Sequence, residues 1–226
     1  MKALEMMEAF RREKRLDYDR PVGEAKPEFQ FQNVFSGKRG HMFGVLEGVD
    51  ERGRPVTLRA FSSLHGGLRY VPGWAPSILP ERDYEGWLVS SQEGIKRMTK
   101  EIEAARDPME IKRLVEARTS RCRALMRKIH DAYHFRNFRG EERPLREVFL
   151  GNSEAMPGGV GDCCAPKLLN QAVQLGIRPL GLAEFFWGGE NASGRKQPGQ
   201  FFSACEDKCQ PILGFLLCGL EDAAGA

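Results

Sequence analysis

Three cysteines in the last third of the chain, Cys163, Cys205 and Cys209, limit the possible folds more than any other feature. Cys163 follows a glycine-rich run (157–162) at the expected start of one helix, and the other two stand at the expected start of the next helix. Helix N-termini carry partial positive charge and favour thiolates. Three such cysteines can hold one ion and leave a tetrahedral position open, as in catalytic zinc sites. The sequence therefore predicts that these three cysteines bind Zn²⁺.

The cysteine pattern leaves alternatives open. The pair in the later helix is spaced by three residues, which is a weaker metal signature than a spacing of two. Cysteine is also often a small buried apolar residue with no ligand. Cys164 is an alternative to Cys163 or a fourth ligand, and four ligands would favour a structural ion over a catalytic one. Cys122 and Cys218 lie in expected helices and are interpreted as core or incidental residues.

The composition fits a folded intracellular chain. Of the 226 residues, 41% are hydrophobic, which is enough for a core, and the net charge is only +3. No apolar run approaches the length of a membrane span, and the N-terminus lacks the apolar core of a signal peptide. We therefore expect a cytoplasmic protein without a membrane partner. In a reducing compartment, the six cysteines favour metal binding or catalysis over disulfides.

Turn residues and hydrophobic spacing place the secondary structure. A turn at 50–55 that contains glycine and proline separates two apolar runs, which predicts a β-hairpin. Asp107 and Pro108 interrupt a long helical pattern as an N-cap and a first helical residue, which predicts two paired helices. The expected elements are a helix (2–15), two strands (41–49 and 56–62), two helices within 90–133, a helix (164–175), a strand (177–187) and a last helix (209–220).

The order of these elements predicts the fold class. Strand, helix, strand and helix alternate toward the end of the chain, which implies parallel pairing in an α/β layer. We expect one α/β domain over residues 1–226 whose short sheet consists of the hairpin plus a parallel strand. Residues 63–150 are expected to form a long helical insertion within it.

Basic residues are concentrated in the expected helical region and just beyond it, from 111 to 146. Such a stripe could neutralise the phosphates of a nucleic acid. Arg121, Arg127 and Lys128 are the candidates for these contacts, and RNA or single-stranded DNA is the expected partner. The alternative is that these charges form an ordinary solvated helix face.

Two segments resemble the cytidine-deaminase-like fold in the form found in bacterial toxins and plant editing proteins. Residues 60–62 (Ala-Phe-Ser) are similar to the segment that follows the hairpin of that family, and residues 163–169 (CCAPKLL) to its first metal helix. The resemblance implies a deaminase-like three-layer domain with a zinc core. The family carries Glu two residues after the first ligand and spaces its cysteine pair by two. Here that position is Ala165, and the spacing is three.

A second resemblance covers most of the chain. The sequence is similar to the N-terminal extension of some bacterial pseudouridine synthases. The shared runs are 42–46 (MFGVL), 161–169 (GDCCAPKLL), 183–188 (AEFFWG) and 199–213 (GQFFSACEDKCQPIL). Pseudouridine synthases need a catalytic Asp in their own domain, for which this chain has no room, so the resemblance does not imply that activity.

Candidate residues for the chemistry follow from the strand expected at 177–187. Glu184 is the expected proton shuttle, because burial in an apolar strand raises the pKa of a carboxyl. Asp162 is the alternative, and Glu184 could instead be a buried carboxylate paired with Arg or Lys. The expected substrate-binding residues are three aromatics that could stack on a base, together with one serine: Phe61, Trp187, Phe201 and Ser62. Each aromatic could instead belong to the core.

Three functions are compatible with this sequence. The first is a zinc-dependent hydrolytic deaminase that acts on a base, most readily cytosine, in a nucleic acid or nucleotide. The second is a catalytically inactive, zinc-stabilised RNA-binding module related to the pseudouridine synthase extensions. The third is a structural zinc domain that recruits a partner protein. A carboxylate within reach of the metal separates the first from the other two.

Overall fold

The computed structural model describes residues 2–35, 40–62, 70–189 and 194–221. The chain divides into two units, each of which is described by itself. Unit 1 consists of Met1–Ile78, Phe135–Glu142 and Val148–Ala226, and unit 2 consists of Leu79–His134 and Arg143–Glu147. Within the described ranges, no helix is both long and apolar enough to cross a membrane.

The predicted hairpin is confirmed in unit 1. Strand β1 (His41–Val49) pairs antiparallel with β2 (Pro55–Phe61), and Phe43 lies opposite Phe61. Asp50 closes the turn by accepting hydrogen bonds from the backbone N–H groups of Arg52 and Arg54, both at 2.9 Å. Gly53 has a φ of 73°, a left-handed conformation that glycine adopts without a steric penalty.

The predicted parallel strand is wrong. Strand β5 (Arg178–Trp187) pairs antiparallel with β1, with Glu184 opposite Gly44, and the sheet order is β2-β1-β5-β6. The reason is that β2 and β5 lie on either side of β1. They run in the same direction as each other, as the intervening helix predicts, but they are not neighbours. The short β6 (Phe201–Phe202) adds a further antiparallel pairing at the end of β5. The α/β class holds, with an antiparallel sheet.

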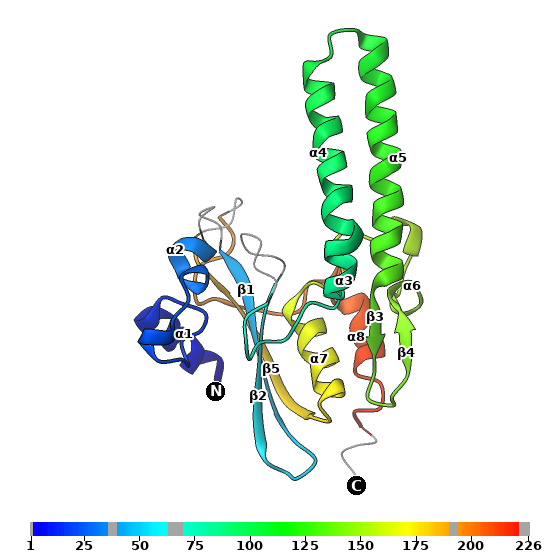
Figure 1. The fold of residues 1–226 in the computed structure, drawn as a ribbon. Coiled ribbons are helices and arrows are strands. Elements are labelled where there is room, and N and C mark those ends of the chain that lie inside the picture. The colour runs from blue at the N-terminus through cyan, green and yellow to red at the C-terminus, as the bar shows by residue number, and fades with distance from the viewer. Residues whose placement is uncertain (1, 36–39, 63–69, 190–193, 222–226) are drawn as a thin grey trace. The chain divides into compact units, whose positions relative to one another are not determined.

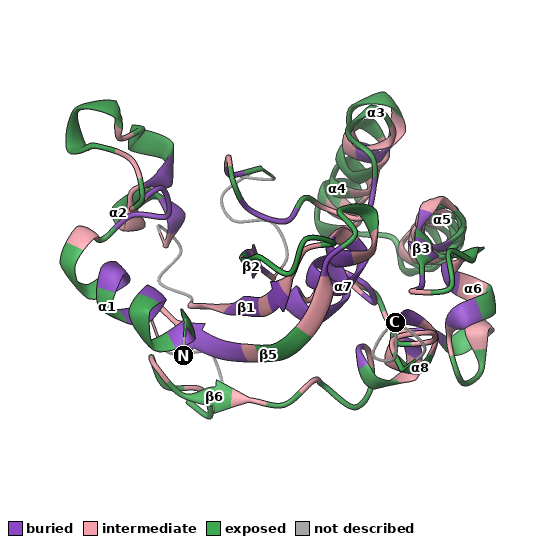
Figure 2. Cartoon of the chain, turned by 90° about the horizontal axis from the view of Figure 1, so that it is seen from below, coloured by how far each residue is buried: buried purple, intermediate pink, exposed green. Residues whose placement is uncertain are grey.

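Helices cover both faces of this sheet (Figures 1 and 2). On one face, α7 (Cys164–Gln174) packs so closely that a Cβ at Gly44 would lie 2.5 Å from the Cys164 Cβ. Gly176, with a φ of 64°, follows the end of α7, and α8 (Gln210–Leu216) packs beside α7. On the other face, α1 (Lys2–Glu13) packs against the main hydrophobic core. Because side chains alternate along a strand, Glu184 faces α7 and Phe185 faces the core.

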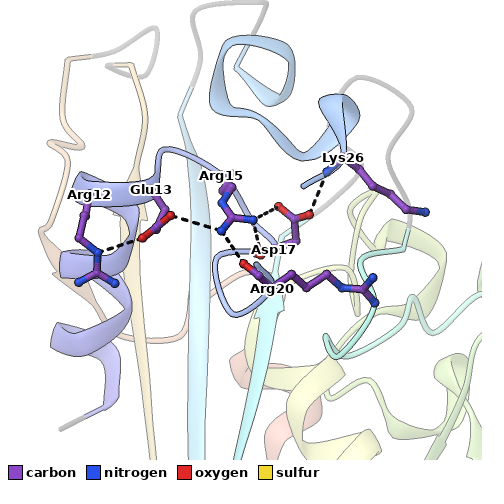
Figure 3. A network of polar contacts seen from close by, with 6 residues as sticks. All are labelled: Arg12, Glu13, Arg15, Asp17, Arg20 and Lys26. Carbon is purple, nitrogen blue, oxygen red and sulfur yellow. Dashed lines mark hydrogen bonds and ion pairs between the residues drawn. The ribbon is translucent and has the colours of Figure 1, made fainter. Parts of the chain in front are cut away.

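A buried arginine stabilises the segment after α1 (Figure 3). The Arg15 side chain donates hydrogen bonds to the carbonyl oxygens of Asp17 and Arg20, at 3.0 and 2.6 Å. It also forms ion pairs with Glu13 at 3.3 Å and with the buried Asp17 at 3.6 Å. Asp17 in turn accepts a hydrogen bond from the backbone N–H of Lys26. Because the buried charges of Arg15 and Asp17 are paired with each other, the network has a structural role.

Unit 2 is built on a helical hairpin, in which α4 (Val89–Ala104) and α5 (Pro108–Ala132) run side by side (Figure 1). The predicted break between them is confirmed, because the Asp107 carboxylate accepts hydrogen bonds from the N–H groups of Met109 and Glu110. The remaining elements are η1 (Val22–Glu24), η2 (Pro27–Phe29), α2 (Phe31–Val34), α3 (Glu81–Asp83), η3 (Tyr84–Leu88), β3 (His134–Arg136), β4 (Glu142–Pro144), α6 (Leu145–Val148) and η4 (Ser153–Ala155).

The N-cap of α5 makes a stability prediction. Replacing Asp107 with alanine leaves two N–H groups at the start of α5 without their acceptor, so we expect a loss of about 1 kcal/mol in the free energy of unfolding. Urea denaturation monitored by circular dichroism measures this loss. Glu116→Ala, an exposed position on the same helix, is the control and should change stability little.

Candidate metal centre

The structure brings together the three cysteines that the sequence predicts. The Sγ atoms of Cys163, Cys205 and Cys209 all lie within 4.8 Å of one another, and three nearby cysteines of this kind could hold a metal ion. Cys163 is the N-cap residue of α7, and Cys209 immediately precedes α8. The Cys209 N–H donates to the Cys205 carbonyl at 3.1 Å, and this turn brings their sulfurs to 3.2 Å. Cys205 is exposed and Cys209 is buried.

The thiols of this cluster perturb one another. A hydrogen bond from Cys209 lowers the pKa of Cys163, although burial and the charge of Glu184 oppose that shift. The same hydrogen bond, together with burial, raises the pKa of Cys209. These opposite directions indicate that Cys163 is the first of the two to become a thiolate. Thiolates are the form in which cysteine binds a metal.

Cys164 does not join the cluster. Its thiol is buried against the sheet and donates a hydrogen bond to the Met42 carbonyl at 3.3 Å. Burial raises its pKa well above the ordinary value, which disfavours the thiolate that a ligand needs. The alternative in which Cys164 is a ligand is therefore not supported. Three cysteines remain, and a tetrahedral ion bound by them has one position left for another group.

Glu184 reaches the start of the first metal helix from the neighbouring strand. The residue is 6% exposed, and its carboxylate accepts a hydrogen bond from the Ala165 N–H at 2.9 Å. Burial raises its pKa, while the Ala165 N–H and the charge of Lys196 act in the opposite direction. Its negative charge also raises the pKa of Cys163. Ala165, which donates the hydrogen bond, lies two residues after Cys163 at the start of α7. Glu184 therefore lies at the N-terminal end of α7 and contacts the backbone of Ala165.

Asp162 lies next to the first cysteine but does not cap α7. Cys163 is the N-cap residue, and it makes no side-chain capping hydrogen bond. The Asp162 carboxylate lies near Gly159, where the Lys208 ammonium also approaches: a Cβ at Gly159 would be 3.8 Å from Asp162 Oδ2 and 3.6 Å from Lys208 Nζ. Asp162 thus supplies a second carboxylate next to the first cysteine. It lies near Gly159 and Lys208, whereas Glu184 contacts the Ala165 N–H.

An apolar groove of about 500 Å³ opens beside Glu184. Only one of its lining residues, Phe201, was predicted from the sequence to bind substrate. Its floor and walls come from α7, β5, β6 and α8 and the residues that follow them: Ala165, Leu169, Pro179, Leu180, Gly181, Leu182, Ala183, Glu184, Phe201, Phe202, Ser203, Ala204, Leu213, Leu217 and Leu220. In the structure the groove is marked by three exposed leucines, at 180, 182 and 217. No sequence motif identifies these leucines as a binding surface.

The other predicted substrate residues lie elsewhere. Phe61 is 1% exposed and belongs to the core on the α1 face, where it packs against Trp74. Trp187 packs at the edge of the same core, with the Arg11 guanidinium 5.4 Å from its ring. Ser62 accepts a hydrogen bond from the Met42 N–H at 3.2 Å. The structure therefore does not bring these three residues into the groove.

The three candidate phosphate contacts lie on α5 in unit 2, and all are exposed. Two of them also make contacts within the unit. The Lys128 ammonium lies 4.2 Å above the Trp87 ring, and the Arg121 guanidinium packs over Gly94 of α4. Arg127 is the remaining candidate. The stripe is thus partly used to join the two helices.

Comparisons with protein-family models, curated proteins and solved structures found no match. The function must therefore be argued from the site.

Proposed function

We propose that this chain is a zinc-dependent hydrolytic deaminase that removes the exocyclic amine of a base, with cytosine the first base to test, free or within a nucleotide or nucleic acid. The observation that carries the proposal is the position of Glu184. Its buried carboxylate meets the Ala165 N–H at the start of α7, beside three clustered cysteines. Metal-assisted hydrolysis requires a carboxylate next to an open coordination position of the metal, and a structural metal site does not.

The donor set supports zinc as the ion. Thiolates favour zinc over hard cations such as Mg²⁺. A tetrahedral ion with Zn–S distances of about 2.3 Å places its sulfurs roughly 3.8 Å apart. The separation of 3.2 Å between the Cys205 and Cys209 sulfurs and the upper bound of 4.8 Å for all three lie on either side of that value, so small side-chain adjustments would suffice. Cys163, Cys205 and Cys209 would hold the ion, as we expect from the sequence.

The order of the parts supports a deaminase-like core. A hairpin (β1 and β2) is followed by a helix that begins at the first cysteine, a strand (β5) and a helix that begins at the cysteine pair. This is the order that the resemblance implies. The carboxylate comes from β5 instead of from the first turn of α7, yet it reaches the N–H of the residue that stands at the family's glutamate position. The family's acid–base group is thus supplied from another element.

The chain's residues have separable tasks in this reaction. Zinc, when bound, supplies Lewis-acid activation of a water molecule near neutral pH. Glu184 would accept one proton from the attacking water and deliver it to the ring nitrogen. It would then carry the remaining proton of that water to the amine, which departs as ammonia while the water oxygen becomes the carbonyl oxygen of the product. The Ala165 N–H holds the carboxylate in position for both transfers. The apolar groove would exclude bulk water from the base, and Phe201 at its wall offers a face for stacking.

Product formation tests this proposal directly. Zinc-loaded protein is incubated with cytosine- and adenine-containing nucleosides and single strands, and deaminated products are quantified by mass spectrometry. We expect product with at least one base, loss of activity after chelation and recovery when zinc is restored. Metal content is measured in the same samples. Fully zinc-loaded, folded protein that forms no product from any of these compounds would contradict the proposal.

A second candidate, an RNA-binding module, is favoured by the exposed basic residues of α5. If Arg127 contacts phosphate, Arg127→Ala should weaken binding to single-stranded RNA and reduce the slope of log K against log salt by about 0.7–1 unit. Fluorescence anisotropy over a salt series measures both effects. Arg52→Ala, at the exposed hairpin turn of unit 1, is the control. Equal slopes in the wild type and Arg127→Ala would assign this charge to solubility.

A further inference from the structure

The groove beside Glu184 runs along an edge of the sheet. Residues 179–183 line it consecutively. Because successive side chains of a strand point to opposite faces, a groove that touches five in a row follows the strand's edge instead of one face. Residues 180–182, in the middle of this stretch, are exposed, and Figure 2 shows an exposed section of β5 flanked by intermediate ones. Leu180 is 63% exposed. A volume of about 500 Å³ is in the range of sites for whole small molecules, so a base would fill only part of it.

The backbone along this edge offers hydrogen bonds. On one side β5 pairs with β1 from Arg178 to Trp187, with a register shift that skips Leu180. On the groove side it pairs with β6 only at Glu184 and Phe185. Among the described strands, none pairs with residues 179–183 on that side. Their outward N–H and C=O groups, apart from the missing N–H of Pro179, can therefore bond to a ligand's hydroxyl or amide groups.

The charge of the groove is unsuited to phosphate. Among the described residues that line it, Glu184 is the only ionisable one. Three thiolates also carry one more negative charge than a divalent ion, so the neighbouring metal centre is net negative. Lys196, whose charge lowers the pKa of Glu184, does not itself line the groove. Its ammonium lies 4.8 Å above the ring of Phe202, a groove residue, and donates to Met42 Sδ at 3.5 Å.

We propose that the groove along β5 holds the remainder of the substrate, and that this remainder is uncharged, with an apolar surface and hydroxyl or amide groups. This inference rests on the proposed function, since it places the reacting ring at Glu184. It narrows the substrate class to compounds in which an amine-bearing base is attached to an uncharged group, and it disfavours phosphorylated compounds. The walls formed by Leu180, Leu182 and Leu217 contact the apolar part, and the free edge of β5 bonds the polar groups.

Three related compounds test the inference with zinc-loaded, full-length protein: cytidine, its 5′-O-butyryl ester and its 5′-monophosphate. Isothermal titration calorimetry measures their dissociation constants, independently of turnover. We expect the ester to bind more tightly than cytidine, by up to roughly fourfold for each methylene group that becomes buried. The monophosphate should bind roughly tenfold or more weakly than cytidine, because like charges placed together are repelled.

Adding a positive charge to the groove tests whether the effect arises there. Leu182→Lys introduces a cation at a partly exposed groove position and should improve binding of the monophosphate relative to the ester, by roughly tenfold. The control is Leu175→Lys, because Leu175 is exposed at the end of α7 and does not line the groove. That control should leave all three dissociation constants unchanged.

The outcomes separate this inference from the proposed function. If the wild type binds the monophosphate as tightly as cytidine and converts both, the inference fails and the deaminase proposal stands. If the ester binds in a manner sensitive to Leu182→Lys but no compound is converted, the groove assignment stands and the deaminase proposal fails. If none of the three binds, both are overturned.

Discussion

Cys209→Ser is expected to abolish metal binding and to lower the midpoint of thermal unfolding by roughly 10 °C or more. Cys209 is 1% exposed, and its Sγ lies 3.2 Å from Cys205 Sγ and is hydrogen-bonded to Cys163. Serine removes a ligand and leaves a hydroxyl in the same buried place. Binding energy at such a site is folding energy, and a loss of several kcal/mol shifts the midpoint by about 2–4 °C per kcal/mol in a chain of this size.

The measurements are zinc stoichiometry by plasma mass spectrometry and unfolding by calorimetry, with and without chelator. Wild type should carry about one zinc ion per chain, and chelation should bring its unfolding midpoint down to that of the variant. Cys122→Ser, a half-buried cysteine of α5 outside the cluster, is the matched control and should retain zinc. Wild-type protein that binds no zinc, and whose unfolding midpoint is the same with and without chelator, would show that the three cysteines do not form a metal centre.

Local signals explain why much of the fold was predictable. The hairpin follows from Asp50 and Gly53, whose side chain and backbone freedom close its turn. The break before α5 follows from Asp107, which caps the helix as its residue type suggests. The end of α7 follows from Gly176, whose left-handed φ of 64° suits glycine at a helix terminus. Each of these depends on a few neighbouring residues, which the sequence lists in order.

The errors concern contacts between distant segments. The alternation of strands and helices indicates the direction in which β5 runs, but not that β1 separates it from β2. Phe61 was expected to stack on a base, yet its register partner Phe43 places it on the core face, while Gly44 and Glu184 face α7. The residue type alone does not show which face of the sheet an aromatic side chain occupies, because that depends on the strand register and on which helix covers each face. The groove was missed for the same reason.

The cluster itself was accessible because its cysteines lie at helix starts, where spacing has geometric meaning. Cys205 and Cys209 are four apart and share one turn, and Cys163 begins the helix that packs beside α8. The apolar strand around Glu184 predicts a buried carboxylate near the cysteines. Its contact with the Ala165 N–H could not be predicted, because it depends on the antiparallel register of β5 against β1.

Glu184→Gln is expected to lower deamination by roughly a hundredfold or more while zinc and the fold are retained, the usual scale for losing an acid–base group. Glutamine has nearly the same shape, and its amide oxygen can still accept the hydrogen bond that Ala165 N–H donates at 2.9 Å. It cannot carry a proton from water to the ring and the leaving amine. Asp162→Asn is the matched control, since it neutralises the other carboxylate next to Cys163 and should cost less than tenfold if Glu184 is the shuttle. Turnover of cytosine- and adenine-containing substrates is measured with zinc quantified in each sample. Equal activity in Glu184→Gln and wild type, or a larger loss in Asp162→Asn, would transfer the role away from Glu184.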